Sequence, residues 1–364
     1  MTSRERFVNV LTGKPVDRVP FMKVFGSTNA VLPRWEQERP GLKQEIDALL
    51  KFEGRYRGWD CPPVNLDLSC INQWEVIAED SETRTARRAD GMVKLFVKGH
   101  DYHHQTVVFP VQNRQDWARI KREFLDPDDP ARFPANWPEL VRLYQGREFP
   151  LQLTHRGVYG FPRVLVGDEA LALLFYDDPE LVHDMMDTYT EFALRVWGKM
   201  VREVDFDLVE CWEDMASKQG SIISPAMVRE FMAPNYRKIR SFAEAHGIPI
   251  VLVDSDGNTM ELAEVLLEAG VNAIYPWEVQ AGNDVDLLRQ RLPGMAAIGG
   301  LKKEAMAEGR DAVEAEMVKA ARLIRKGRYI PGPDHFVQSH TSWEQYRYFM
   351  TRLREVVLST PVEA

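Results

Sequence analysis

The sequence contains few cysteines, and this scarcity indicates the compartment in which the protein works. Its 364 residues include only Cys61, Cys70 and Cys211, which form neither a CxxC motif nor a paired framework. A small secreted domain would need disulfides from such a framework. The N-terminal residues also lack the apolar stretch of a signal peptide. We therefore expect a cytoplasmic protein.

Long apolar runs and basic clusters are missing as well. No stretch approaches the roughly 20 apolar residues that a membrane-spanning helix requires. The formal net charge is −9, and lysine and arginine form no cluster that would bind nucleic acid. No GxGxxG motif follows a strand pattern, which weakens a dinucleotide-binding interpretation. The expected partner is a small-molecule substrate, with neither nucleic acid nor membrane, and the oligomeric state is left open, a homodimer included.

From residue 150 onward, short apolar runs alternate regularly with helical patterns. Parallel strands that are buried on both faces produce continuous apolar runs of this kind. With a first strand at 18–25 and another near Cys61, the count reaches about eight, which favours a closed (β/α)8 TIM barrel of the α/β class over an open sheet. The later strands are expected at 151–154, 206–212, 249–253, 273–275, 296–300 and 328–330.

The N-terminal third differs from these repeated units. A helical segment comes first, with one helix capped by Thr2 or Ser3 and a second at 33–52. Residues 61–112 then alternate apolar and polar side chains between short turns, which is typical of antiparallel hairpins with one wet face. We predict a single barrel domain over 1–364, in which 61–112 form a β-rich insertion.

Polar residues gather where the predicted strands end. The apolar run at 249–253 is followed at once by Asp254, Ser255 and Asp256. Because Asp254 and Asp256 are two residues apart, they share a face of an extended strand end, where they could bind a cation or divide acid and base roles. The alternative is that Asp256 or Asn258 caps the helix that follows.

Other strand ends supply further candidates. In α/β barrels, binding and catalytic residues lie at the carboxyl ends of the strands. His335 follows the run at 328–330 and is expected opposite the acidic pair. The remaining polar or aromatic candidates at strand ends are His155, Arg156, Trp212, Glu213, Lys218 and Glu278.

Several motifs resemble those of the uroporphyrinogen decarboxylase superfamily, and the resemblance covers essentially the whole chain. They are the residues at 4–7, 11–13 and 17–20, then 252–258, and finally 327–330, 334–335 and 342–346. The resemblance implies a TIM barrel and one of two activities, which are cofactor-free decarboxylation of uroporphyrinogen and zinc-dependent methyl transfer involving corrinoid proteins. The decarboxylase branch carries an arginine-rich signature after the first strand. The corresponding segment here, 23–28, contains no arginine, which favours the methyltransferase branch.

The resemblance also implies a metal site. Methyltransferases that act on thiols bind zinc through a His-x-Cys-Gly turn and a later Cys. By position, Asp254 matches that His, Asp256 the first Cys and His335 the second Cys, so these three residues are expected to hold a divalent metal, zinc above all. Glu213 is expected to be a fourth ligand or the acid that protonates a leaving oxygen.

The leading prediction is a methyltransferase that moves a methyl group from a small methylated substrate, such as a methoxy compound, to a corrinoid carried by a partner protein. Asp256, His335 and Glu213 would be catalytic. The substrate would be held by His155, Arg156, Trp212, Lys218 and Glu278, and Arg163 is a further candidate to hold a carboxylate. The alternatives are a cofactor-free decarboxylase of a porphyrinogen or smaller carboxylate, and a non-catalytic protein that binds a corrinoid or tetrapyrrole.

Overall fold

The computed structural model describes residues 1–24, 31–99 and 104–363, and its centre is a sheet of six parallel strands. Their order in the sheet is β12-β11-β10-β9-β6-β5, so that each strand pairs with the next one of the barrel series. The strands are β5 (Gln152–His155), β6 (Leu208–Trp212), β9 (Ile250–Asp254), β10 (Ala273–Tyr275), β11 (Ala296–Leu301) and β12 (Tyr329–Pro333). All six predicted later strands are therefore present, with ends that differ by a few residues.

Two extended segments without regular strand pairing complete the ring between β12 and β5. The first segment, which contains Val24, packs on β12, because a Cβ added to Gly332 would come within 2.6 Å of Val24 Cβ. The second segment comes later in the chain and contains Asp60, which forms a parallel bridge with Leu151 just before β5. The two segments meet where a Cβ on Gly58 would come within 2.5 Å of Met22 Cβ. The fold is thus the predicted TIM barrel, with segments in place of its first two strands.

The strand expected at 18–25 is not formed over the part of it that the structure describes. Pro20 has no N–H for a ladder, and the N–H of Phe21 donates instead to the carboxylate of Glu53 at 3.2 Å. The carbonyl of Phe21 accepts the Glu53 N–H at 2.8 Å. Residue 25 and the arginine-free positions 25–28 lie outside the described residues.

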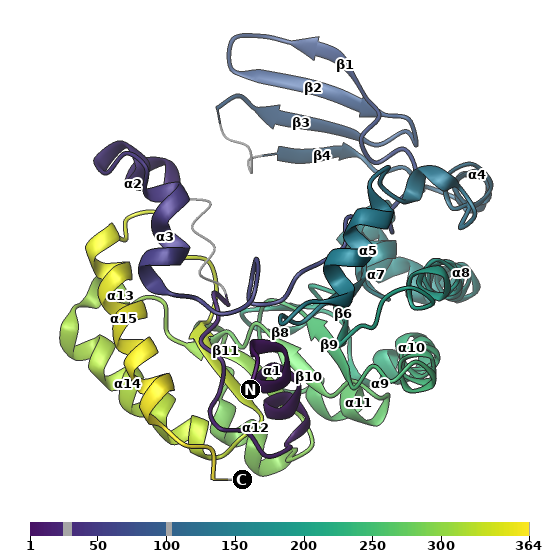
Figure 1. Ribbon diagram of the computed structural model, residues 1–364. Coiled ribbons are helices and arrows are strands. Elements are labelled where there is room, and N and C mark those ends of the chain that lie inside the picture. The colour runs from purple at the N-terminus through teal and green to yellow at the C-terminus, as the bar shows by residue number, and fades with distance from the viewer. Residues whose placement is uncertain (25–30, 100–103, 364) are drawn as a thin grey trace.

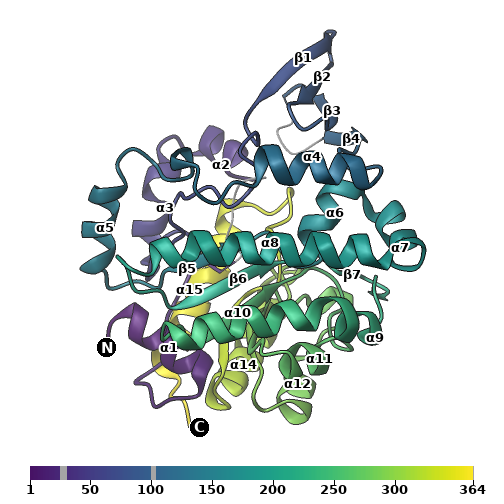
Figure 2. The ribbon, with the colours of Figure 1, turned by 90° about the vertical axis from the view of Figure 1, so that its right-hand side faces the viewer.

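Helices surround the sheet on its outside, as Figure 2 shows for the face that α8 and α10 cover. The long α8 (Pro179–Met200) has an N-cap Asp178 whose side chain accepts the N–H of Leu181, and it buries one apolar stripe against the sheet. Such a stripe is the usual source of helix stability in a folded protein. The other outer helices are α6 (Gly160–Val166), α7 (Asp168–Asp177), α9 (Pro225–Met227), α10 (Ala233–Ala245), α11 (Ala263–Glu268), α12 (Val285–Arg291), α13 (Ala305–Glu308), α14 (Arg310–Arg325) and α15 (Trp343–Ser359).

The N-terminal helix α1 (Ser3–Thr12) covers the end of the barrel at which the strands begin. Thr2 and Glu5 form a capping box at its start, and Gly13 ends it with φ 70°. Arg4 pairs with Asp207 just before β6 at 2.8 Å, and Arg328 just before β12 donates to the carbonyl of Leu11 at 3.0 Å. With α1 at this end, the carboxyl ends of the strands remain for ligands.

The second helix predicted at 33–52 is divided into α2 (Leu32–Glu38) and α3 (Leu42–Leu50). Pro40 and Gly41 separate the two, and Gly41 has φ 91°, a conformation that a helix interior does not contain.

The β-rich insertion forms a separate antiparallel sheet in the order β1-β2-β3-β4, which stands beside the barrel in Figure 1. Its strands are β1 (Trp74–Glu79), β2 (Thr83–Arg88), β3 (Val93–Val97) and β4 (His104–Val108). The hairpin pattern predicts the first three and misses β4. The chain returns to the barrel through α4 (Arg114–Phe124) and α5 (Trp137–Gln145).

Among the helices in the described ranges, none combines the length and the apolar character that crossing a bilayer requires.

Candidate active site

The polar groups at the carboxyl ends of β6 and β9 form the core of the candidate site. Asp254 ends β9, and it lies opposite Trp212 in the register between β6 and β9. Glu210, two residues earlier on β6, points to the same side, and both carboxyl groups are almost completely buried, with 5% and 4% of their residue surfaces exposed.

Arg57, from the extended segment before β5, holds these two carboxyl groups together. Its Nη1 lies 3.2 Å from Glu210 Oε1 and 3.2 Å from Asp254 Oδ2. Its guanidinium carbon also lies 5.6 Å from the ring centre of Tyr275 at the end of β10. Trp59 Nε1 donates to Glu210 Oε2 at 3.1 Å. The cluster therefore joins three strand ends with a segment that is far away in sequence.

Burial of this cluster changes the proton affinity of its acids. The pKa of Asp254 is raised well above its ordinary value, first because the carboxyl group is buried and then because of the negative charge of Glu210, while Arg57 opposes the shift. Burial is the largest single effect on the pKa of Arg57, and it acts to lower that pKa. The attraction of Glu210, Tyr275 and Asp254 for the cation together outweighs burial, so the pKa of Arg57 is raised. The buried carboxyl group of Asp254 therefore holds a proton more tightly than an exposed aspartate does.

Asp256 and His335 form a second polar pair beside this cluster. His335 Nε2 lies 3.2 Å from each carboxylate oxygen of Asp256. Asp256 does not cap a helix, because α11 begins at Ala263 and its N-cap, Leu262, makes no side-chain capping bond. The turn requires glycine at Gly257, which has φ 81° and where a Cβ would come within 2.6 Å of the Ala216 backbone. Of the three residues predicted to share one site, Asp256 and His335 are therefore in direct contact.

The three expected metal ligands do not share one point in this arrangement. Asp254 faces the guanidinium of Arg57, which would repel a cation, and Asp256 is already bonded directly to His335. Over 1–24, 31–99 and 104–363, no three His, Cys, Asp or Glu side chains gather closely enough to hold a metal ion. Tetrahedral zinc needs at least three protein donors about 2.0–2.3 Å from one centre. The side chains as they lie do not fit the three-ligand zinc centre.

Glu213 has a different environment from the one expected of a ligand or proton donor. It is fully buried, and Glu213 Oε1 accepts hydrogen bonds from the N–H of Val158 at 2.7 Å and from the hydroxyl of Tyr236 at 2.6 Å. Its Oε2 accepts the N–H groups of Tyr159 and Gly160 at 2.7 and 3.0 Å. Burial raises the pKa of Glu213, against these hydrogen bonds. Because both oxygens are engaged, we assign Glu213 to holding the loop before α6, in place of the catalytic role expected from the sequence.

Arg156 and Arg163 both place their guanidinium groups over the ring of Trp212. Their guanidinium carbons are 4.6 and 5.5 Å from its ring centre. Arg156 Nε pairs with Asp67 at 3.0 Å, and Arg163 Nη2 pairs with Asp214 at 2.9 Å. Arg156, Arg163 and Trp212 thus form one group at the ends of β5 and β6.

Three other expected substrate contacts lie elsewhere. His155 is fully buried against Tyr189 and Trp197, and burial lowers its pKa to about 3. Lys218 is exposed at the turn between the short strands β7 (Ala216–Ser217) and β8 (Gly220–Ser221). Glu278 supports the Asp256 turn, since its Oε2 accepts the N–H of Gly257 at 2.8 Å. None of the three has a side chain at the acid cluster.

The sequence interpretation assigned no role to Arg57, Glu210 and Asp214. Arg57 belongs to an irregular segment without periodicity, so no local pattern indicates it. Glu210 had a usable signal, because a carboxylate inside the apolar run of β6 must find a partner when it is buried. Asp214 has φ 46°, and its carboxylate accepts the backbone N–H of Asp256.

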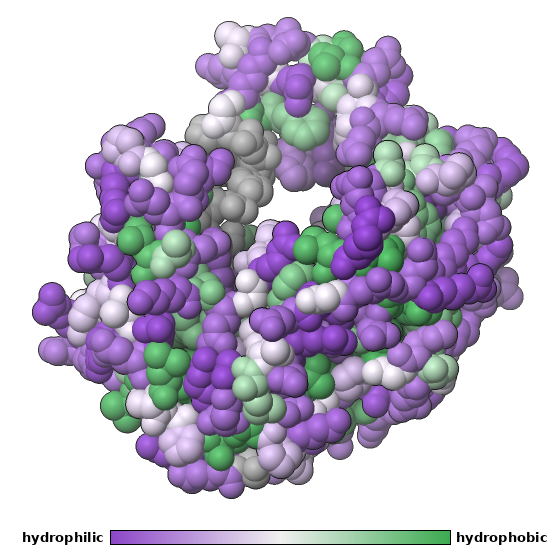
Figure 3. Space-filling view, viewed as in Figure 1, coloured by the Kyte–Doolittle hydropathy of each residue, from purple (hydrophilic) through white to green (hydrophobic). Residues whose placement is uncertain are grey.

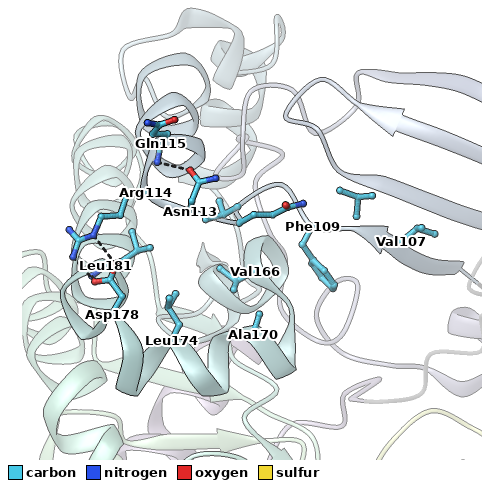
Figure 4. A pocket seen from close by; sticks show the side chains of 13 residues that line it. Val107, Phe109, Asn113, Arg114, Gln115, Val166, Ala170, Leu174, Asp178 and Leu181 are labelled. Carbon is cyan, nitrogen blue, oxygen red and sulfur yellow. Dashed lines mark hydrogen bonds and ion pairs between the residues drawn. The ribbon is translucent and has the colours of Figure 1, made fainter.

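A cleft of about 900 Å³ lies away from these strand ends, between β4 and the helices α6, α7 and α8. Its walls are mainly apolar, with Val107, Phe109, Val166 and Leu174 pointing into it in Figure 4. The charged groups at its rim are the exposed ion pair of Arg114 with Asp178. We place the candidate active site by its convergent polar groups, which this cleft lacks.

A parallel barrel with buried, interacting carboxyl groups at the carboxyl ends of its strands has the architecture of a TIM-barrel enzyme. The family model described as uroporphyrinogen decarboxylase (URO-D) matches residues 159–356. The chain belongs to this family.

One solved structure agrees on the fold over the full length of the chain. A methyltransferase from Methanosarcina mazei matches with a TM-score of 0.61 and 15% identity over 98% of this chain and 99% of that one. A protein described as a vitamin-B12 independent methionine synthase from Listeria monocytogenes has a TM-score of 0.34 and 13% identity over 60% and 69% of the two chains. A 3-keto-L-gulonate-6-phosphate decarboxylase from Vibrio cholerae has a TM-score of 0.25 and 11% identity over 61% and 89%. No curated protein sequence matches the chain.

Proposed function

We propose that this protein demethylates a small methoxy compound and passes the methyl group to a corrinoid on a partner protein. The observation that carries the proposal is the buried carboxyl pair of Asp254 and Glu210 on one guanidinium. The full-length likeness in fold to the Methanosarcina mazei methyltransferase is compatible with this activity.

The chemistry requires a proton. When the methyl–oxygen bond breaks, its electron pair stays on oxygen, and the methyl carbon forms a new bond with an electron pair of the acceptor. The oxygen is a poor leaving group unless it is protonated, and a positioned general acid contributes on the order of 10²–10⁴-fold to such a step. Burial and the negative charge of Glu210 raise the pKa of Asp254, which favours its protonated form. We assign Asp254 as the acid, with Arg57 fixing its position.

Asp256 and His335 lie next to this acid and complete the polar surface. Their bond leaves His335 the ability to exchange a proton with Asp256 as the product leaves. We assign this pair to the return of the proton to the site after each turnover.

A decarboxylase is the second candidate function, and the pair of Asp256 and His335 favours it. Loss of carbon dioxide from a pyrrole side chain needs a proton donor for the carbon that is left, and His335 with Asp256 is such a donor pair. In that case Asp254 and Glu210 would accept pyrrole N–H groups.

One assay separates these two functions. Free cobalamin, chemically reduced to its nucleophilic state, serves as the acceptor for a panel of charged and neutral methoxy compounds, and methylcobalamin is followed by its absorbance. In parallel, uroporphyrinogen is incubated with the protein, and its products are separated by charge. We expect methyl transfer from at least one methoxy compound and unchanged uroporphyrinogen; decarboxylation without methyl transfer would overturn the proposal.

The variant Asp254→Asn tests the acid. We expect it to lower methyl transfer by on the order of 10²-fold or more while binding of the methoxy compound is retained. Asp128→Asn, at an exposed carboxylate that pairs with Arg195 and Lys199, is the control and should keep full activity.

A further inference from the structure

A tyrosine with a strained backbone lies beside the acid cluster. The carbonyl of Arg55 accepts the N–H of Gly58 at 2.8 Å, so residues 55–58 form a β-turn in which Tyr56 is the second residue. Tyr56 has φ 54°, in the left-handed region. Turns with a positive φ at this position mostly contain glycine, asparagine or aspartate there, and a bulky aromatic residue makes the conformation costly. The sequence thus places a tyrosine where the backbone favours glycine.

The turn is held at both of its ends, which keeps Tyr56 in this conformation. Just before the turn, the N–H of Glu53 donates to the carbonyl of Phe21 at 2.8 Å. At the end of the turn, Gly58 packs so closely on Met22 that an added Cβ would come within 2.5 Å of Met22 Cβ. The strain at Tyr56 is therefore fixed by contacts outside the turn.

Packing within the protein does not compensate for this strain. Tyr56 is 70% exposed, so its ring buries little apolar surface. One face of the ring lies against Arg57, whose guanidinium carbon is 5.6 Å from the ring centre. A cation–π contact at an exposed site is weaker than the cost of a bulky residue at positive φ. A residue that costs stability in the free protein indicates a functional constraint at this position.

The exposed fractions of the side chains rise from the acids toward Tyr56. The side chain of Asp254 is 7% exposed and that of Arg57 is 32% exposed, whereas Tyr56 reaches 70%. The same guanidinium carbon lies 5.6 Å from the ring centre of Tyr275, which is fully buried. Arg57 therefore lies between a buried ring on the inside and an exposed ring on the outside.

A ligand of the acid cluster has to come from this outer side. In the space-filling view an open gap separates the β1–β4 sheet from the barrel (Figure 3). At the other end of the barrel, α1 covers the start of the strands. A molecule that enters from the open end and reaches Asp254 therefore extends along Arg57 to the ring of Tyr56.

We propose that Tyr56 contacts the substrate of the methyl transfer proposed above. The face of its ring that is turned away from Arg57 packs on the part of the methoxy compound that extends from the acid cluster toward solvent. This contact contributes to binding and determines which methoxy compounds fit. The inference rests on the proposed function for the identity of the substrate, whereas the contact itself is measured without turnover.

Fluorine NMR detects the contact directly. The protein is labelled with 3-fluorotyrosine, and the resonances of Tyr56 and Tyr176 are identified by their loss in Tyr56→Phe and Tyr176→Phe. 4-Methoxyphenol, 4-methoxybenzoate and methoxyacetate are then titrated separately. We expect at least one of these probes to shift the Tyr56 resonance with saturation and to leave that of Tyr176, which is 77% exposed on α7, in place. If no probe gives a saturable shift of Tyr56, or if both resonances shift equally, the inference is wrong.

Two glycine variants separate the ligand contact from the backbone strain. Tyr56→Gly removes the ring, and Lys51→Gly is the matched control, because Lys51 is exposed and has φ 59° at the end of α3. Both variants should keep or raise the melting temperature, since glycine adopts a positive φ without strain.

Calorimetry with the probe that shifts the Tyr56 resonance then compares their affinities. Tyr56→Gly should bind this probe roughly three- to tenfold more weakly than the wild type, because the ring contact is lost. Lys51→Gly, and Tyr56→Phe with its ring retained, should bind it as the wild type does. Unchanged affinity in Tyr56→Gly, or an equal loss in Lys51→Gly, would overturn the inference. A shift of the Tyr56 resonance without methyl transfer from any probe would refute the proposed function alone.

Discussion

Replacing Arg57 with methionine gives the sharpest test of the acid cluster. The change keeps the length of the side chain and removes the cation that lies 3.2 Å from both Glu210 and Asp254. Removing one partner of a buried ion pair costs about 3–5 kcal/mol. Because the Arg57 side chain is 32% exposed and the acids can take up protons, we expect the low end, ~3 kcal/mol at neutral pH.

The loss of stability in Arg57→Met should depend on pH, and the raised pKa of Asp254 determines the direction of that dependence. The pKa of Asp254 is raised in the folded state, so the folded protein binds more protons than the unfolded chain above the unfolded pKa of about 3.9. Its stability therefore falls as pH rises from that value through the folded pKa. Without Arg57 the folded pKa rises further, and the variant should lose more stability at about pH 8 than at about pH 5.

Urea unfolding at the two pH values measures both effects. Arg55→Met is the control, since Arg55 lies two residues away, is half exposed and is 3.5 Å from Asp60, a pair worth at most about 1 kcal/mol. Adding Asp254→Asn to Arg57→Met should recover part of the stability, because the uncompensated acid is removed. An Arg57→Met protein as stable as the Arg55→Met control, or equally destabilised at both pH values, would refute the account of the cluster.

Three further predictions concern the neighbouring groups. Glu213→Gln should lower stability by about 1–3 kcal/mol in urea, because one of its oxygens becomes a donor facing backbone N–H groups; unchanged stability would show that the loop does not depend on it. Asp256→Ala should remove activity with a nearly unchanged melting temperature, since no helix cap is lost, and a marked drop in that temperature would contradict this. After dialysis against zinc-buffered solution, elemental analysis should find less than one zinc per chain, because Arg57 and His335 occupy the carboxylates; one bound equivalent that Asp256→Ala abolishes would restore the three-ligand site.

Much of the barrel was predictable because its strands are buried on both faces. The apolar runs at β9 and β11 are continuous, and this pattern does not depend on distant residues. The irregular backbone of the two segments that complete the ring could not be predicted. Their backbone groups bond to the side chain of Glu53 and to a single bridge with Leu151 instead of to a regular ladder. Local patterns do not contain such partners.

The candidate site shows the same division. The meeting of Asp256 and His335 follows from their places at two strand ends, which periodicity alone locates. The orientation of Asp254 does not, because it depends on Arg57, which reaches the cluster from 197 residues away in the chain. The role of Glu213 could not be predicted either, because the N–H groups that donate to its carboxylate lie on a loop more than 50 residues earlier in the chain.

The β1–β4 sheet has a consequence for how this protein can diversify. Within the described residues, no strand of that sheet pairs with a strand of the barrel, and all four strands lie between 74 and 108 in the chain. Changes in its length or composition therefore leave the hydrogen bonds of the barrel untouched. The acids of the candidate site lie on the barrel, so a lineage can change the sheet while it inherits the polar groups of the candidate site.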